Sequence, residues 1–583
     1  MEQIDFASPS TIDGADSEFN YSALVWQGYW LSRDQFGPLA MGSGMGIPFA
    51  PPMDMIQAAM QMVAQNPADQ PFVPQNLAPL QALYRSGDTA LAQDMTAFAP
   101  DDFAGLRLDP PTFEEVVGVA GQAELMLKES QWTRNFHTES HFGTPESDFG
   151  AQQRFVGMMT ALLAQMQGQY AMQMLMNPAD GLYYDSDGAL DYRGNWVLLH
   201  AFADIAGITG DPTLRYANAD AHGMFAGAAG QLFQALSGRE IADAPEGTSA
   251  VRALAFLAWT TDDDALRESA LARLEEIAAT LAAIQPDSPA AHSARIVGLL
   301  AAAQASGGPI NPSVTESWEA LQAAFNPATG VFDGTSTYTT DDVAWLIGGA
   351  NFMLQAGPDA LKAEAARTLV AFYEATLNQS GMQLSAPPGK DRAMAGPFEK
   401  DLPSVVYYHG RNTPPPPMAG GQFGRLPLPA AEVQLQNGAW AVTDTRVDSA
   451  GAMHLANELN WLGPHLGSIP FPPLRDAAAS NPGGNAGAAS TDITISARDI
   501  AFDTSALAAP AGQEVTLTFV NNDDAVPHNF HLSGSGGIDA KTDIFPGSDG
   551  RSRTLRFTLD RPGTYTFVCD VHRGQMSGTL TAG

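Results

Sequence analysis

The chain has 583 residues, of which 45% are hydrophobic and 16% are charged, and its formal net charge is −35 at pH 7. This length predicts two or more globular domains, and the acidic excess excludes nucleic acid as a partner because phosphate binding needs lysine and arginine. A basic redox partner would instead be attracted. With one cysteine no intramolecular disulfide can form, and no apolar run reaches the about 18 residues that a transmembrane helix needs.

The first 110 residues have little periodic pattern. Residues 41–62 are rich in Met, Gly and Pro, and only residues 54–63 favour a helix. We therefore expect residues 1–110 to be an irregular segment packed on the domain that follows. The N-terminus also lacks the basic and apolar stretches of a signal peptide.

Residues 111–474 are expected to form one large, mainly helical domain. An amphipathic stripe with steps of three and four residues runs through Phe155, Met159, Leu162, Met166 and Tyr170. Residues 253–283 and 359–377 have the same pattern, and no strand pattern separates these helices, so stacked antiparallel helix pairs are predicted. Towards the end of this domain, a strand pair is expected at 431–444 and a short helix at 453–462.

An internal repeat lies within the helical domain. Residues 177–181 (Asn-Pro-Ala-Asp-Gly) recur as residues 326–330 (Asn-Pro-Ala-Thr-Gly), an offset of 149 residues, and the same offset separates Trp196 from Trp345. In each copy a helix is expected to end at the Asn-Pro, and the glycine to take a left-handed conformation before the next helix. About 50 residues per helical hairpin and three hairpins per repeat predict a solenoid or a closed ring of helix pairs.

The order of helix, Asn-Pro-x-x-Gly-aromatic turn, acidic loop and helix resembles the (α/α) toroids of six-hairpin glycosidases and N-acylglucosamine-type epimerases. The resemblance covers roughly residues 110–400 and implies a ligand site at the mouth of the ring. Acids of the repeated loops are then candidates for acid and base catalysis on a glycoside. They are Asp185, Asp187, Asp191, Asp333, Asp341 and Asp342. The alternative is that these residues form turns and helix caps.

Other side chains of the helical domain could bind a metal. His137 and His141 would share one face of a helix, and His454 and His465 flank Trp461. Either pair could form a second metal site or be structural. Thioethers bind Cu(I), and methionines are clustered at Met158, Met159, Met166, Met172, Met174 and Met176. Because methionine at helical spacing usually fills a core, we interpret this cluster as core.

Residues 475–491 are small and polar, as in a flexible linker, and they separate the helical domain from residues 492–583. In this C-terminal domain, polar and apolar residues alternate over 514–520, 553–559 and 564–568, between turns rich in Gly, Pro, Asn and Asp. Such a pattern predicts the short strands of a β-sandwich.

The C-terminal domain has a thiol, an imidazole and a thioether within eight residues, at Cys569, His572 and Met576, and a further imidazole at His528. These residues and the strand pattern resemble the cupredoxins, in particular the plastocyanin-like group. The resemblance implies an all-β Greek-key sandwich that binds one type 1 (blue) copper through these four residues and transfers electrons. It also implies an extracytoplasmic protein, periplasmic or secreted, whose signal peptide has been removed. His531 is expected to be a bystander on the opposite face of the strand that carries His528.

Two functions are compatible with these patterns. In the first, the chain is a copper-binding electron-transfer protein, and the helical domain is a docking or assembly platform for a redox partner. In the second, it is a redox-linked enzyme whose toroid acts on a saccharide as a hydrolase or epimerase. Opposed carboxylates about 5–9 Å apart across an open ring mouth would favour the enzyme, whereas a mouth plugged by residues 1–110 or 400–470 would favour the platform.

Overall fold

The computed structural model describes the chain except for residues 1–20, 51–52, 64–70, 72, 74, 93–102, 136–148, 212–213, 215, 384–424, 427, 463–489, 499–500, 503, 505, 524–525, 535–537, 549, 560, 562, 572–575 and 583. Most of the expected linker therefore lies outside the described residues, as do His137, His141, His465 and His572. Among the helices that are described, none is long and apolar enough to cross a membrane.

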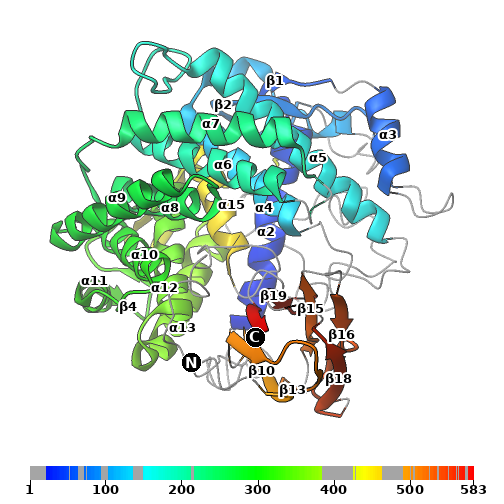
Figure 1. Ribbon diagram of the computed structural model, residues 1–583. Helices are drawn as coiled ribbons and strands as arrows, with labels where there is room; N and C mark the ends of the chain where they lie inside the picture. Colours follow the sequence, from blue (N-terminus) through cyan, green and yellow to red (C-terminus); the bar gives the residue numbers. More distant parts are fainter. Residues whose placement is uncertain are drawn as a thin grey trace. The chain divides into compact units, whose positions relative to one another are not determined.

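The chain forms two compact units, Met1–Phe471 and Pro472–Gly583. In the first unit, six helices contact one another in a closed cycle. Each of them is labelled in Figure 1. In cycle order they are α4 (Val119–Asn135), α6 (Tyr192–Gly210), α8 (Ala244–Thr260), α10 (Pro289–Ser306), α12 (Thr340–Ala356) and α15 (Ser449–Asn460), which contacts α4 again. Their packing partners, in the same order, are α5 (Phe149–Tyr170), α7 (Ala219–Leu236), α9 (Asp264–Ala283), α11 (Pro312–Ala324), α13 (Asp359–Tyr373) and α2 (Tyr21–Met41).

The amino-acid pattern explains which helices lie inside. A helix that is apolar all round is buried, whereas a helix with one apolar stripe covers a surface. Helix α6 is buried without a break from Gly194 to Ala206. Helix α9 buries only Ala270, Leu274, Ile277 and Leu281, at steps of three and four residues. The core of this unit therefore lies between the cycle helices and their partners.

The two copies of the sequence repeat form the same turn. Antiparallel pairing joins Met176 to Tyr183 in the first copy and Phe325 to Phe332 in the second. Gly181 and Gly330 have φ angles of 75° and 72°, which confirms the expected left-handed conformation. Each turn leads into a helix of the cycle, α6 or α12, which carries the repeated tryptophan in a buried position.

Gly330 is expected to tolerate alanine less well than Gly181. Both substitutions place a Cβ in the left-handed region, which costs about 1–2 kcal/mol. A Cβ on Gly330 would also lie 2.6 Å from the Ala371 carbonyl oxygen, whereas the nearest atom to one on Gly181 is the Ala235 Cβ at 3.5 Å. Urea unfolding should therefore show a loss of unfolding free energy about 1–3 kcal/mol larger for Gly330→Ala than for Gly181→Ala. Equal losses would mean that the second turn does not approach Ala371 closely.

Residues 1–110, expected to be irregular, contain regular elements in their described parts. These are α2, α3 (Met53–Val63), β1 (Gly46–Pro48), β2 (Leu80–Asp88) and a short 3₁₀ helix, Phe103–Leu106. Only α3 was expected, at 54–63. Strand β2 pairs with β1 and also with β3 (Glu114–Val117) and β9 (Arg446–Asp448), so distant parts of the chain supply its partners. Helix α2 has no clear apolar stripe because it buries polar side chains between its apolar ones.

The remaining expected elements of this unit are mostly present. Strands β6 (Thr337–Thr339), β7 (Glu432–Gln436) and β8 (Ala439–Asp444) form one sheet. The last two confirm the strand pair expected at 431–444, and α15 is the short helix expected at 453–462. The helical pattern at 253–283 belongs to two helices, α8 and α9. Of the methionines interpreted as core, Met174 is 65% exposed.

Two of the sheets in the second unit enclose one core. The first sheet has the order β11 (Ala501–Phe502), β10 (Asp492–Arg498), β13 (Glu514–Asn521) and β18 (Ser552–Thr558). The second has the order β12 (Ala506–Ala509), β20 (Ser577–Ala582), β19 (Gly563–Val568), β15 (His531–Gly534) and β16 (Ile538–Lys541). Alternate residues of β13, Val515, Leu517 and Phe519, are buried in one cluster with Leu532 and Phe567 of the second sheet. The expected β-sandwich is therefore confirmed.

Candidate functional site

Two of the expected copper ligands lie at the ends of neighbouring strands. Cys569 directly follows β19 and Met576 directly precedes β20, and these strands are antiparallel neighbours. The Cys569 N–H donates to the Met576 carbonyl oxygen at 2.9 Å, so the loop between them is closed at its base. His572 belongs to this loop, outside the described residues. The two strands thus fix the backbone of the thiol and of the thioether.

His528 brings an imidazole to the Cys569 thiol from elsewhere in the sandwich. It lies in β14 (Pro527–His528), which pairs with β17 (Phe545–Pro546). Its Nδ1 is 3.7 Å from Cys569 Sγ, and the side chains of His528, Cys569 and Met576 are fully buried. Thiolate and imidazole bonds of about 2.3 and about 2.0 Å to a divalent metal, at about 120°, would put sulfur and nitrogen about 3.7 Å apart. The pair is therefore spaced as two ligands of one ion.

The protonation of His528 also suits a ligand. Burial lowers the pKa of His528, against the raising effect of Asp523, so the imidazole is neutral at neutral pH. A neutral imidazole can offer one ring nitrogen to a metal.

Among the described residues, no three His, Cys, Asp or Glu side chains gather as a metal site. The expected ligand set includes His572, which lies outside them, and the thioether of Met576.

The residues that follow Cys569 and His528 are hydrogen-bonded to each other. Asn529 Oδ1 accepts the Asp570 N–H at 2.7 Å, and Asn529 Nδ2 donates to Asp570 Oδ2 at 2.8 Å. His531 Nδ1 lies 2.7 Å from Asp570 Oδ1. His531 does not share a strand with His528, because it begins the separate strand β15. These bonds tie the loop that starts at Cys569 to the segment that carries His528.

Comparisons with known proteins bear on this unit. Residues 477–582 match the cupredoxin-like domain family. This part of the chain is a cupredoxin-like domain. Similar solved structures include reduced auracyanin from the photosynthetic bacterium Roseiflexus castenholzii, at 30% identity over 16% of this chain and 98% of that chain (TM-score 0.15). Auracyanin A, a "blue" copper protein from Chloroflexus aurantiacus, is 25% identical over 16% and 98% of the two chains (TM-score 0.15). A Cu-containing nitrite reductase from Thermus scotoductus is 22% identical over 16% and 22% (TM-score 0.14). No curated protein matches the chain significantly.

The acids of the first repeated loop lie before or at the start of α6. Asp185 accepts the Val119 N–H at 2.8 Å, and Asp185 and Asp187 both accept from Arg85 Nη2, at 2.8 and 3.1 Å. Asp191 occupies the N-cap position of α6 and makes no side-chain capping bond. Asp185 thus holds the loop against the start of α4, and both carboxylates hold it against Arg85 of β2.

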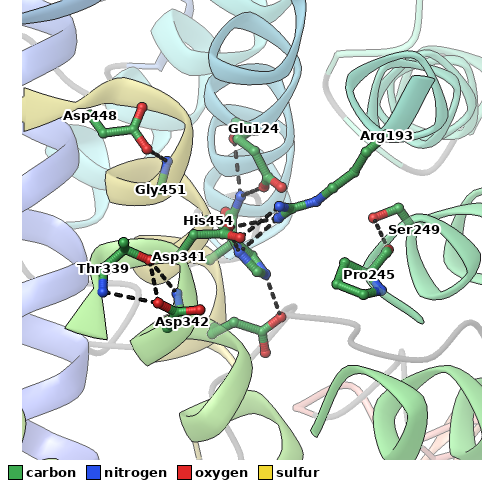
Figure 2. A network of polar contacts seen from close by, with 12 residues as sticks. Glu124, Arg193, Pro245, Ser249, Thr339, Asp341, Asp342, Asp448, Gly451 and His454 are labelled. Carbon is green, nitrogen blue, oxygen red and sulfur yellow. Dashed lines mark hydrogen bonds and ion pairs between the residues drawn. The ribbon is translucent and has the colours of Figure 1, made fainter. Parts of the chain in front are cut away.

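The acids of the second repeated loop differ from one another. Asp333 Oδ1 accepts from Asn326 Nδ2 at 3.1 Å, within the turn. Asp342 forms a capping box with Thr339 at the start of α12 (Figure 2). Asp341 precedes Asp342 directly, but its carboxylate bonds to residues of other helices. Only Asp341 of this loop therefore belongs to a larger polar network.

The network of Asp341 joins charged side chains from several helices of the cycle (Figure 2). Arg193 of α6 donates to both oxygens of Asp341, at 2.6 and 2.7 Å. His454 of α15 has Nδ1 2.7 Å from Asp341 Oδ1 and Nε2 3.4 Å from Glu458 Oε1. Glu458 Oε1 also accepts from Arg252 of α8 at 2.7 Å. His454, considered above as a metal ligand, thus has a carboxylate at each ring nitrogen.

Glu124 of α4 lies close enough to this network for the charges of His454 and Arg193 to act on its pKa (Figure 2). Its Oε2 accepts from Asn457 Nδ2 at 2.8 Å, and burial raises its pKa. Burial acts on Asp341 in the same direction, but Arg193 and His454 hold the pKa of Asp341 well below its usual range. The pKa of Glu124 is therefore raised by burial, whereas that of Asp341 is lowered by its ion pairs.

The sequence patterns identified only part of this network. They singled out Asp341 and His454, but not Arg193, Arg252 or Glu458. One sequence feature could have identified a further member of the network, namely a charged residue within a helix whose other residues are small or apolar. Arg252 is such a residue, since α8 is buried without a break from Gly247 to Ala258.

His454 is expected to remain protonated to about pH 9. Burial lowers its pKa, but Asp341 and Glu458 outweigh this effect and raise the pKa from 6.5 to about 9. Because the folded-state value is the higher one, the contribution to stability is complete below about pH 6.5 and is lost as the pH rises through about 9. The full contribution is on the order of 3 kcal/mol.

The unfolding free energy of the wild type, measured with urea, should fall across this pH window. The unfolding free energy of His454→Gln should depend less on pH over the same window. An NMR titration of the His454 imidazole measures the pKa directly. A midpoint close to the ordinary histidine value would show that the two carboxylates do not hold the ring as described.

Proposed function

We propose that the cupredoxin-like domain binds one type 1 copper through His528, Cys569, His572 and Met576, and that the protein transfers single electrons. The observation that carries this proposal is the 3.7 Å separation of Cys569 Sγ and His528 Nδ1 in a fully buried position beside Met576. Two imidazoles, a thiolate and a weak axial thioether are the ligand set of blue-copper electron-transfer sites. Bound copper would supply a one-electron couple between Cu(II) and Cu(I).

The chain itself supplies a rigid and dry frame for these ligands. The Cys569–Met576 backbone bond holds both ends of the ligand loop, and the Asn529–Asp570 bridge ties this loop to the His528 segment. Burial of the His528, Cys569 and Met576 side chains keeps water away from their ligand atoms. We therefore expect the ligand atoms to keep their positions in both oxidation states, which favours rapid electron transfer.

Copper titration of the full chain tests this proposal. One equivalent of Cu(II) should produce an intense visible absorption band from thiolate-to-copper charge transfer, and a one-electron reductant should bleach it reversibly. A weak band, as given by nitrogen and oxygen ligands alone, would contradict the proposed ligand set.

We further infer that the helical unit is an (α/α) toroid. Two observations support this: the closed cycle of six helices, each with its own packing partner, and the identical turns in the two repeat copies. As a docking platform, this unit would orient a redox partner, and the net charge of −35 favours a basic one. An extracytoplasmic location accords with the cupredoxin-like domain.

A second candidate function is a saccharide-directed enzyme in the helical unit. It is favoured by Glu124 and Asp341, because environments that push two carboxyl pKa values in opposite directions are typical of acid and base pairs. The Arg193 and Asp341 side chains are 27% and 28% exposed, so the network reaches the surface. The Arg193 guanidinium also lies over the Trp345 ring, 5.1 Å from its centroid.

Calorimetry with neutral oligosaccharides, followed by product analysis, separates the two roles of the helical unit. Binding and turnover that Glu124→Gln abolishes would support the enzyme. If no oligosaccharide binds, the docking platform is favoured, and removal of residues 1–474 should then slow electron exchange with the native redox partner.

A further inference from the structure

Each ring nitrogen of His528 lies near a polar side-chain atom, the thiol sulfur of Cys569 or a carboxylate oxygen of Asp523. Nδ1 lies 3.7 Å from Cys569 Sγ, and Nε2 lies 2.8 Å from Asp523 Oδ2. The imidazole is fully buried and Asp523 is 8% exposed, so solvent screens this contact little. Because the carboxylate accepts the proton of Nε2, the lone pair of the neutral ring is placed on Nδ1, the atom that faces the thiol.

A hydrogen-bonded turn keeps Asp523 in the position from which its carboxylate reaches His528. Asn521 Oδ1 accepts the Asp523 N–H at 2.9 Å, and Asn521 Nδ2 donates to the Phe545 carbonyl at 2.7 Å. The Gly547 N–H donates to the Asp523 carbonyl at 2.8 Å. A Cβ on Gly547 would lie 2.7 and 2.8 Å from two backbone oxygens of this turn, so only glycine fits there. The turn that carries the carboxylate is therefore held by the end of β13 and by β17, which is the partner strand of the one that carries His528.

We propose that Asp523 is a positioning residue that sets the tautomer of His528 and, by its charge, lowers the reduction potential of the copper centre. This inference rests on the proposed copper site. A carboxylate on the outer nitrogen of a ligating histidine fixes the ring and makes it a stronger donor. A stronger donor and a nearby negative charge stabilise Cu(II) more than Cu(I), because Cu(II) has the higher charge. Loss of the carboxylate should therefore raise the potential and weaken Cu(II) binding.

Asp523→Asn is the sharpest variant, because it keeps the size and an acceptor oxygen but removes the charge. Its copper potential should be higher than that of the wild type, and its Cu(II) affinity lower by about 10–100-fold. Asp543→Asn is the matched control, because it removes an equal charge from an exposed position of the same unit. Asp523→Ala serves as the second variant, since it removes the acceptor altogether.

The copper-free protein provides an independent readout. Nitrogen NMR of the His528 imidazole should show the Nε2–H tautomer in the wild type and in Asp543→Asn, and a mixture of tautomers in Asp523→Ala. If Asp523→Asn has the potential of its control, or if the tautomer does not depend on residue 523, the proposal is overturned. If no variant binds copper, the proposed function fails, whereas the tautomer measurement still decides whether Asp523 orients His528.

Discussion

Replacement of Cys569 by serine should abolish the intense visible band of the copper-loaded protein and reduce its Cu(II) affinity strongly. The thiolate is the only soft anionic ligand available, because Cys569 is the only cysteine of the chain. A serine hydroxyl is neither soft nor ionised at neutral pH, so the charge-transfer transition is lost. The buried hydroxyl also costs the unit on the order of 1–3 kcal/mol of stability, which leaves a sandwich of this size folded.

Met576→Leu is the matched control for this experiment. It replaces a fully buried side chain by one of similar volume but leaves the thiolate and the imidazoles unchanged, so the visible band should remain. Circular dichroism of both copper-free variants checks that the sandwich is intact. A blue band that survives in Cys569→Ser, with an intact fold, would show that the thiolate of Cys569 is not the copper ligand.

The second large effect is expected in the helical unit, where Glu458→Gln should lower the unfolding free energy by about 3–5 kcal/mol. Glu458 is fully buried, and its Oε1 accepts from Arg252 at 2.7 Å and lies 3.4 Å from His454 Nε2. Removal of its charge takes a carboxylate away from two buried cations, Arg252 and His454, and of these it is His454 that also contacts Asp341. Urea or thermal unfolding measures the loss.

Glu276→Gln provides the comparison, because Glu276 is paired with Arg273 at 2.8 Å but its side chain is 67% exposed. An exposed ion pair contributes about 0–1 kcal/mol, so this variant should unfold almost as the wild type does. Equal losses in the two variants would contradict the burial and pairing described for Glu458.

The sequence was informative for the cupredoxin-like domain because its key features are local. Cys569, His572 and Met576 lie within eight residues, and the alternation in β13 and β19 is visible without any contact from elsewhere. The support of the site is different. Asn529 and Asp570 are 41 positions apart, and their bridge depends on the pairing of β15 with β19. No periodic pattern predicts such a contact.

The helical unit shows the same division between local and distant information. The turns at Gly181 and Gly330 were predicted because the repeat fixes them locally. Asp341 and Asp342 are neighbours with the same local pattern, yet one binds Arg193, 148 positions away, and the other caps α12. Only the packing of α6 against the rest of the cycle distinguishes them.

The position of α2 was not predictable for a related reason. This helix packs on α15, which lies more than 400 positions further along the chain, and it completes the set of packing partners. Its contacts bury polar groups such as Ser32, which donates to the Ala456 carbonyl at 2.5 Å. Because the buried face of this helix includes such polar groups, its sequence has no apolar stripe from which the packing could have been predicted.

X-ray absorption at the copper edge of the full chain, loaded with one equivalent of Cu(II), tests the central claim most directly. We expect one short sulfur scatterer, from Cys569, together with imidazole scattering from His528 and His572. We also expect these distances to change little when the copper is reduced. A first shell of nitrogen and oxygen atoms alone would contradict the copper centre proposed for this chain.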